Sequence, residues 1–274
     1  MGETQNRGIE LTINSKNIVT RNFTWVTSFV FSWNCNEIKD LYGDKKDDLG
    51  NRWFIGHPIG VIYDYVKEGI WQEDEIARGD QKNHDPVAKA GDLKLKDVNG
   101  DHKIDDNDRV ILGQTSPKWN GGLTNTFTYK NLTLNIFIQT TQGLMKDNAL
   151  LAMAGDEMGR RNSIVKIGYW TPENKSNKWR SLCKNSNPHG YGFPQKASYT
   201  RLKDVTLSYT FSTSITNALH IGGLQVYVSG RNLITWTDWT GWDPESTELQ
   251  RGWGGYEDSY PMTKSYVFGL NLTF

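Results

Sequence analysis

The chain has 274 residues, and 31 Lys and Arg residues balance 31 Asp and Glu residues, so the formal net charge is zero. This balance argues against nucleic-acid binding, which requires a basic excess. No stretch of about 18 consecutive apolar residues is present, which excludes a transmembrane helix. A membrane β-barrel stays open, because its strands turn only every second side chain towards lipid.

Alternation of apolar and polar residues with period two is the strongest pattern in the chain, and it predicts β-strands. It is clearest at the C-terminus, where Phe268, Leu270 and Leu272 alternate with Gly269 and Asn271. In chain order, the predicted strands are 8–14, 23–33, 119–129, 132–140, 199–211, 224–230 and 266–274. Most of them have the length of about 9–11 residues with which a tilted strand crosses a bilayer.

Short and long connections alternate between these strands. The short ones are 15–22, 130–131 and 212–223, and the long ones are 34–118, 141–198 and 235–264. An up-and-down membrane barrel with tight periplasmic turns and long outer loops has this pattern. The predicted fold class is therefore all-β, an antiparallel transmembrane β-barrel with long extracellular loops.

The predicted strand number is odd, whereas bacterial single-chain barrels have an even number from 8 upward. An open sheet would leave two unpaired edges in lipid. We therefore expect residues 1–274 to form the C-terminal part of a larger barrel, about its last seven strands. Polar residues follow Met1, so no signal peptide is expected within this chain.

Several segments resemble the C-terminal barrel region of SusC/RagA-type TonB-dependent outer-membrane transporters of Bacteroidota. The resemblance covers essentially the whole chain, in order. Segment 56–71 is similar to an outer-loop hairpin of that family, and 199–209 to the strand that follows its long loop. The segments that carry the resemblance are 6–11 (NRGIEL), 56–65 (GHPIGVIYDY), 68–71 (EGIW), 91–101 (GDLKLKDVNGD), 108–113 (DRVILG), 199–209 (YTRLKDVTLSY) and 241–245 (GWDPE).

The resemblance implies a barrel of the 22-stranded type, filled by an N-terminal plug that is absent from this chain. It further implies a SusD-like lipoprotein lid, a TonB complex that acts through the plug, and import of glycans or peptides across the outer membrane of a Gram-negative cell. The lid is expected to dock on the long loops. Gly269, Leu272 and Phe274 match the terminal strand of outer-membrane barrels, whose last aromatic residue serves as an assembly signal; an ordinary edge strand is the alternative.

Residues 97–108 predict a calcium loop, because oxygen ligands stand at the six spacings that such loops use. The expected ligands are Asp97, Asn99, Asp101, the Lys103 carbonyl, Asp105 and Asp108. Ile104 is expected to anchor the loop in a core. The loop departs from the usual pattern in two ways: His102 replaces the glycine of position six, and Asp108 replaces the longer Glu. An ion-free acidic loop held by Asx-turns is the alternative.

Trp239 and Trp242 stand beside carboxylates in the last long loop. Indole faces next to acids suit sugar rings, so both are candidate substrate contacts, with packing between the loop and its partner as the alternative. Trp236 lies at a strand end, where a membrane-interface aromatic girdle is expected. The five histidines have no metal-ligand spacing and are interpreted as solvated.

Cys35 and Cys183 can be free or paired, since spacing alone does not decide. No nucleophile, phosphate-loop or catalytic carboxylate motif is present, so an enzyme is not predicted. A transporter fragment is the favoured function. The alternative is a soluble, secreted glycan-binding β-domain with a calcium loop, which would need polar residues on the outer faces of its strands.

Overall fold

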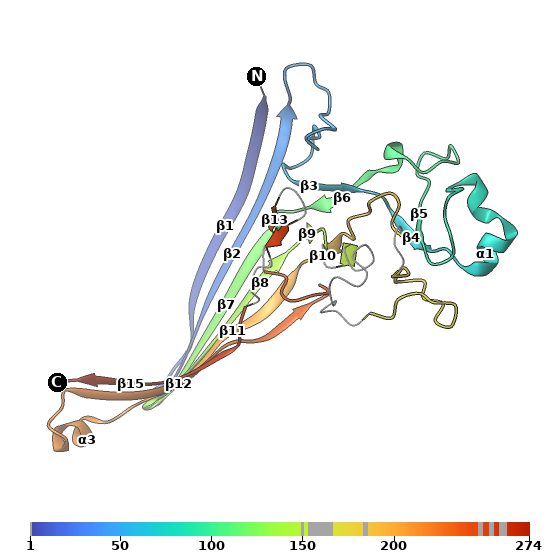
Figure 1. The fold of residues 1–274 in the computed structure, drawn as a ribbon. Coiled ribbons are helices and arrows are strands. Elements are labelled where there is room, and N and C mark those ends of the chain that lie inside the picture. Colours follow the sequence, from blue (N-terminus) through green and yellow to red (C-terminus); the bar gives the residue numbers. More distant parts are fainter. Residues whose placement is uncertain are drawn as a thin grey trace.

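Seven long strands form one antiparallel sheet in the order β1-β2-β7-β8-β11-β12-β15. The computed structural model describes residues 2–148, 151–152, 167–182, 186–245, 249–251, 255–257 and 262–274. The sheet strands are β1 Glu3–Val19, β2 Phe23–Asp40, β7 Trp119–Tyr129, β8 Leu132–Gln142, β11 Tyr199–Thr210, β12 Gly223–Thr237 and β15 Ser265–Thr273. Each pairs with the next along the chain, which gives the curved meander of Figure 1. The predicted all-β class, strand order and connections are confirmed.

Three strands extend well beyond their predicted bounds. β1 begins at Glu3, β2 continues to Asp40, and β12 continues to Thr237. In the extension of β1 and β2, backbone pairing runs on through residues that are polar on both faces, for example Arg7 opposite Cys35. Alternation of apolar residues therefore predicts only the part of a strand that has an apolar face. Backbone hydrogen bonds extend the strand beyond that part.

One face of the sheet is apolar from edge to edge. A row of directly paired residues that crosses the sheet from β1 to β12 is entirely apolar. Its members, in strand order, are Ile13, Phe29, Leu123, Ile138, Leu202 and Ile234. Nearer the tight turns, Val228 and Phe268 continue the same face into β15. Large apolar side chains remain exposed on it; Phe268, for example, is 82% exposed. A face of this size rarely stays open in a protein that is surrounded by water.

The opposite face is polar and carries hydrogen bonds between neighbouring strands. The Asn135 amide donates to the Thr126 hydroxyl at 2.9 Å, and the Thr206 hydroxyl donates to Ser229 at 2.9 Å. Ser229 in turn donates to Asp204 at 3.1 Å. This arrangement is the inverse of a soluble sandwich and matches a barrel wall with lipid outside and water inside.

The height of the apolar band fits a bilayer. In β7, Trp119 and Tyr129 bound the band, and Trp119 lies opposite Trp33 of β2. Ten residues of strand span about 33 Å, which is about 25 Å along the membrane normal at a tilt of about 40°. Trp236 lies on the same apolar face, opposite Thr200, which agrees with its predicted place in an aromatic girdle. No helix in the described part of the chain has the length and apolar character to cross a membrane.

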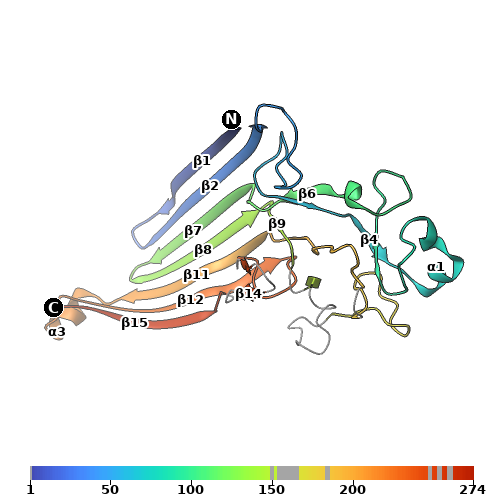
Figure 2. The same ribbon diagram turned by 45° about the horizontal axis from the view of Figure 1, so that its top comes forward.

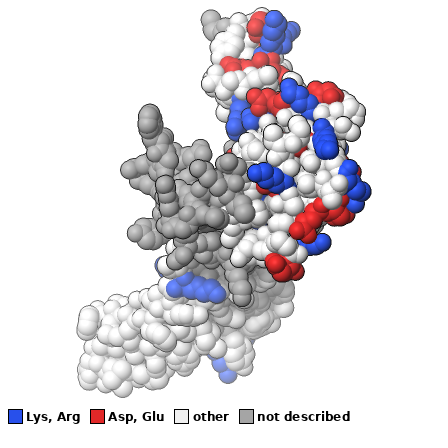
Figure 3. Space-filling model, turned by 45° about the vertical axis from the view of Figure 1, so that its right-hand side comes forward, with Lys and Arg blue, Asp and Glu red and all other residues white. Residues whose placement is uncertain are grey.

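All long connections leave one end of the sheet, and the tight turns leave the other, together with α3 (Thr213–Ala218) and the C-terminus (Figure 2). On the face that Figure 3 shows, charged side chains crowd over the lobe that the long connections form, whereas few of them lie on the strand region below it. The chain thus separates a polar lobe from an apolar wall.

The polar lobe has secondary structure and a core of its own. Its elements are β3 Val61–Asp64, β4 Lys67–Ile70, α1 Glu73–Arg78, η1 Asp80–Asn83, β5 Leu93–Leu95, η2 Asp106–Asp108, β6 Val110–Gln114, β9 Met145–Lys146, β10 Gln195–Lys196, β13 Leu249–Arg251 and β14 Gly255–Glu257. Buried Tyr65, Ile70, Leu93, Ile104 and Phe193 belong to one core that joins the first two long connections. The predicted anchoring role of Ile104 is confirmed, since this side chain is 7% exposed.

The predicted hairpin within residues 56–71 is wrong. β3 pairs with β6, and β4 pairs with β5, so the two strands of this segment are not partners. The partners lie more than 20 residues away along the chain, and nothing in a local pattern identifies them. Cys35 is free and exposed; Cys183 lies outside the described residues.

Candidate functional site

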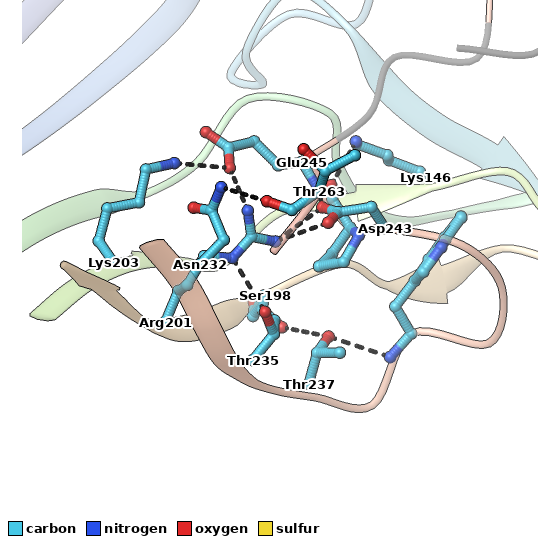
Figure 4. Close-up of polar contacts among 12 residues, drawn as sticks. Lys146, Ser198, Arg201, Lys203, Asn232, Thr235, Thr237, Asp243, Glu245 and Thr263 are labelled. Atoms are coloured by element: carbon cyan, nitrogen blue, oxygen red, sulfur yellow. Dashed lines mark hydrogen bonds and ion pairs between the residues drawn. The ribbon is translucent and has the colours of Figure 1, made fainter. Parts of the chain in front are cut away.

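A buried arginine fixes the last long connection to the top of the sheet. Arg201 of β11 has a side chain that is 0% exposed. One terminal nitrogen donates to both oxygens of Asp243 at 2.8 Å, and the other donates to Glu245 at 2.7 Å. Its Nε donates to the Thr235 hydroxyl at 2.9 Å (Figure 4). We call Arg201, Asp243 and Glu245 the loop latch.

The latch lies on the polar face of the sheet, because Thr200 faces the apolar side and Arg201 the other. Lys203 supports it with an ion pair to Glu245 at 3.2 Å. Two carboxylates and two cations thus offset one another in a place where an unpaired charge would be costly. The segment from Thr237 to Glu245 is thereby held on the water-facing side of the wall.

Further contacts attach the same segment to the second long connection. The Asn148 amide donates to the Thr240 carbonyl at 2.6 Å, and the Thr240 N–H donates to Gln195 at 3.1 Å. Lys146 donates to the Pro244 carbonyl at 2.6 Å. On this anchored segment, Trp242 is 50% exposed and Trp239 is partly buried. Trp242 therefore presents the more open indole face.

The residues proposed for calcium form a closely folded loop between β5 and β6. The Asp97 carboxylate accepts N–H groups from Gly100 at 2.7 Å and His102 at 2.8 Å. Asp108, which is fully buried, accepts from Val98 at 2.8 Å and Asp105 at 2.9 Å, and so joins both ends of the loop.

The remaining proposed ligands make contacts within the same loop. Asn99 accepts the Asp101 N–H, Asp101 accepts the Lys103 N–H, and the Lys103 ammonium lies 3.0 Å from Asp105. Each carboxylate retains lone pairs beyond these bonds, since it offers about four acceptor sites. The oxygen set is compatible with Ca²⁺, although Asp105 is shared with an ammonium group.

The last strand carries the three residues of the candidate assembly signal. Phe274 is 96% exposed at the chain end and Leu272 is 43% exposed on the apolar face. Gly269 lies opposite Tyr227 of β12, and a Cβ added to Gly269 would stand 2.1 Å from the Tyr227 ring. The absence of a side chain at position 269 is what allows the tyrosine to lie across the last strand.

We expect Gly269→Val to weaken the pairing of β15 with β12, at a cost of about 1–3 kcal/mol for overpacking. The measurement is the urea midpoint of the folded chain in detergent. Combining the change with Tyr227→Ala removes the clash and should recover part of the loss. A midpoint that is unaltered in Gly269→Val would contradict this role.

Two carboxyls lie close together in the polar lobe, that of buried Asp64 and that of Asp147, whose residue as a whole is exposed. Asp64 is the last residue of β3, and Asp147 follows β9. Both carboxyls lie beside Gly192: a Cβ added to this glycine would stand 3.2 Å from the Asp64 carboxyl and 3.1 Å from the Asp147 carboxyl. Burial raises the pKa of Asp64, against two backbone N–H donors that lower it. Partial desolvation of its carboxyl, followed by repulsion from Asp64, raises the pKa of Asp147.

A raised folded-state pKa means that the native state binds the proton more tightly than the unfolded chain. The resulting stabilisation is complete below the unfolded pKa of about 4 and is lost as the pH rises through the folded values. We therefore expect Asp147→Asn to stabilise the polar lobe at pH 7 and to flatten its dependence on pH. Denaturant unfolding at a series of pH values tests this; equal slopes in both proteins would contradict it.

The antiparallel sheet and its exposed apolar face define the class of the protein: it is a membrane protein that spans the bilayer with β-strands and carries a folded polar lobe at one end of the sheet. No protein-family model matches the sequence. TonB-dependent receptors P3 and P26 of Formosa agariphila are 30% and 32% identical to it, and each match covers 100% of this chain and 29% of the relative. TonB-dependent receptor SusC of Bacteroides thetaiotaomicron is 25% identical, with 27% of its length covered.

Solved structures agree on the fold. The RagAB peptide transporter matches with a TM-score of 0.74 and 24% identity, over 100% of this chain and 30% of that chain. The open-open state of the RagAB peptide importer matches with a TM-score of 0.75. The homologues of this chain are thus TonB-dependent receptors, SusC among them, and the predicted resemblance and outer-membrane location are confirmed. The chain spans about three tenths of the length of the relatives that it matches.

Proposed function

We propose that residues 1–274 form the C-terminal part of a TonB-dependent barrel that imports oligomeric nutrients, either glycans or peptides, through the outer membrane. The supporting observation is the two-sided sheet, with an apolar band on one face and a hydrogen-bonded polar face on the other. The two open edges, β1 and β15, would pair with the strands of the remaining barrel. The relatives are receptors and transporters, which supports a role without catalysis.

A SusD-like lipoprotein is the proposed partner on the outer side, and the TonB complex is proposed to act through a plug that precedes these residues in the whole protein. The polar lobe offers the docking surface, because it carries its own core and most of the charged side chains. The exposed apolar face disfavours the alternative of a soluble glycan-binding domain, since water would surround it.

We assign direct substrate contact to Trp242, with Trp239 beside it. The latch holds their segment on the polar face, so an incoming molecule would meet an aromatic surface that is already ordered. Binding to an ordered surface loses less conformational entropy. Ca²⁺ is proposed as a structural ion in loop 97–108, where six oxygen ligands would further fix the docking lobe.

The test is uptake of labelled oligosaccharides and labelled peptides by cells that carry the intact gene with Trp242→Ala. Uptake of one of the two classes is expected to fall about tenfold at an unchanged amount of protein in the outer membrane. Trp236→Ala is the matched control, because this indole is 52% exposed but lies on the apolar face. Equal uptake by both variants would contradict the assignment.

A further inference from the structure

Two histidines and one carboxylate from separate segments converge in the polar lobe. His84 follows η1, whereas Asp97 and His102 belong to the 97–108 loop. One donor atom from each of the three lies within 4.8 Å of the others. The two imidazole centroids are 6.1 Å apart, and the Ile104 N–H donates to the His84 carbonyl at 3.2 Å, which holds the two segments together.

The nitrogen that His84 directs at this group has no hydrogen bond. Its Nδ1 is buried and unpartnered among the described residues, and it lies 3.7 Å from the Asp97 carboxylate. That separation is too long for a hydrogen bond. A buried donor or acceptor left unsatisfied is costly in a folded protein, so a third group between His84 and Asp97 would resolve the arrangement.

The backbone of His102 has a positive φ, as do seven other non-glycine residues in the described part of the chain. Its φ is +65°, in the left-handed region that favours glycine. Loops of this kind carry glycine at this sixth position.

We propose that His84, Asp97 and His102 bind one divalent transition-metal ion of the zinc class. Two imidazoles with one carboxylate suit Zn²⁺, Co²⁺ or Ni²⁺, whereas Ca²⁺ takes oxygen ligands. Metal–ligand bonds are about 2.0–2.2 Å long, so the three donor atoms must move closer to one another by a few tenths of an ångström or more to bind one ion. The exposed side chain of His102 has the freedom to make this movement. Water completes the coordination, and the ion joins the η1 segment to the loop.

The site would share Asp97 with the proposed calcium loop, so the two ions compete for one carboxylate. The Asp97 carboxylate has lone pairs left after its two backbone hydrogen bonds. A zinc-class ion therefore should not add to a calcium-loaded loop independently. This competition concerns only the polar lobe and does not depend on transport.

The test uses Co²⁺ as a spectroscopic probe and Zn²⁺ as its competitor on the whole metal-stripped chain in detergent. We expect one equivalent of Co²⁺ to give ligand-field absorption bands that Zn²⁺ abolishes. His84→Ala and His102→Gly should each weaken binding at least about tenfold. His102→Gly also removes the backbone strain, so loss of binding in that variant does not reflect misfolding.

The matched controls are His57→Ala and His220→Ala, which remove histidines distant from the cluster in the sequence, and both should bind Co²⁺ as the unchanged chain does. The proposal is overturned if the unchanged chain binds no Co²⁺ or Zn²⁺. It is equally overturned if His84→Ala and His102→Gly keep full affinity, or if only Ca²⁺ binds to the loop.

Discussion

Replacing Arg201 with alanine is expected to destabilise the protein by about 3–5 kcal/mol, since it removes the guanidinium from a buried ion pair with Asp243 and Glu245. Asp243 is 6% exposed and accepts two hydrogen bonds from the guanidinium. The measurement is the free energy of unfolding in urea, in detergent or lipid. Protease cutting within 235–264 should become faster at the same time, because the latch fixes this segment.

Two further variants separate charge from geometry at the latch. Arg201→Lys keeps the charge but cannot bond both carboxylates bidentately, so it should lose a large part of the stability. Lys203→Ala is the matched control on the same strand. It removes a partly exposed ion pair and should cost at most about 1 kcal/mol. Equal effects of Arg201→Ala and Lys203→Ala would contradict the latch.

Introducing arginine at Ile136 is expected to cost about 2–4 kcal/mol, the penalty for a cation near the middle of the lipid-facing band. Ile136 lies midway along β8, opposite Val205 and Asn125. The measurement is unfolding in lipid vesicles, together with the yield of membrane-inserted protein. Both quantities should fall.

Asn135→Arg is the matched control, one residue away on the polar face. Asn135 bonds Thr126 across the strands, so its replacement should cost about 1 kcal/mol for one lost hydrogen bond. An equal penalty at positions 135 and 136 would mean that the two faces meet the same solvent. That outcome would contradict a membrane-spanning sheet.

The strands were predictable because lipid on one side and water on the other impose a period of two. The period of two does not continue through Leu202, because an irregularity between Leu202 and Asp204 shifts the pairing register of β11. This shift places Leu202 on the apolar face with Val205, although one position is even and the other odd. Bulges of this kind have no reliable signal in a single sequence.

The sites were less predictable, because their partners are brought together by the long connections. Arg201 contacts Asp243 and Glu245 more than 40 residues away, and its only local sign was a charged residue at the top of a predicted strand. Spacing alone predicts that His84 and His102 are solvated, whereas the folded lobe brings both near Asp97. Loop 97–108 was recognisable because its proposed ligands are close in sequence; whether it holds Ca²⁺ stays a prediction.

The central claim is that one face of the sheet meets lipid and the other meets water. It is tested most directly by nitroxide spin labels on cysteines at Leu207 and Thr206, adjacent residues of β11, in a chain with Cys35 and Cys183 replaced by serine and inserted in lipid. We predict that the label at 207 is relaxed mainly by oxygen and the label at 206 mainly by a water-soluble nickel complex. If both labels are reached equally by the nickel complex, or the label at 207 is shielded from both reagents, the sheet does not form a barrel wall.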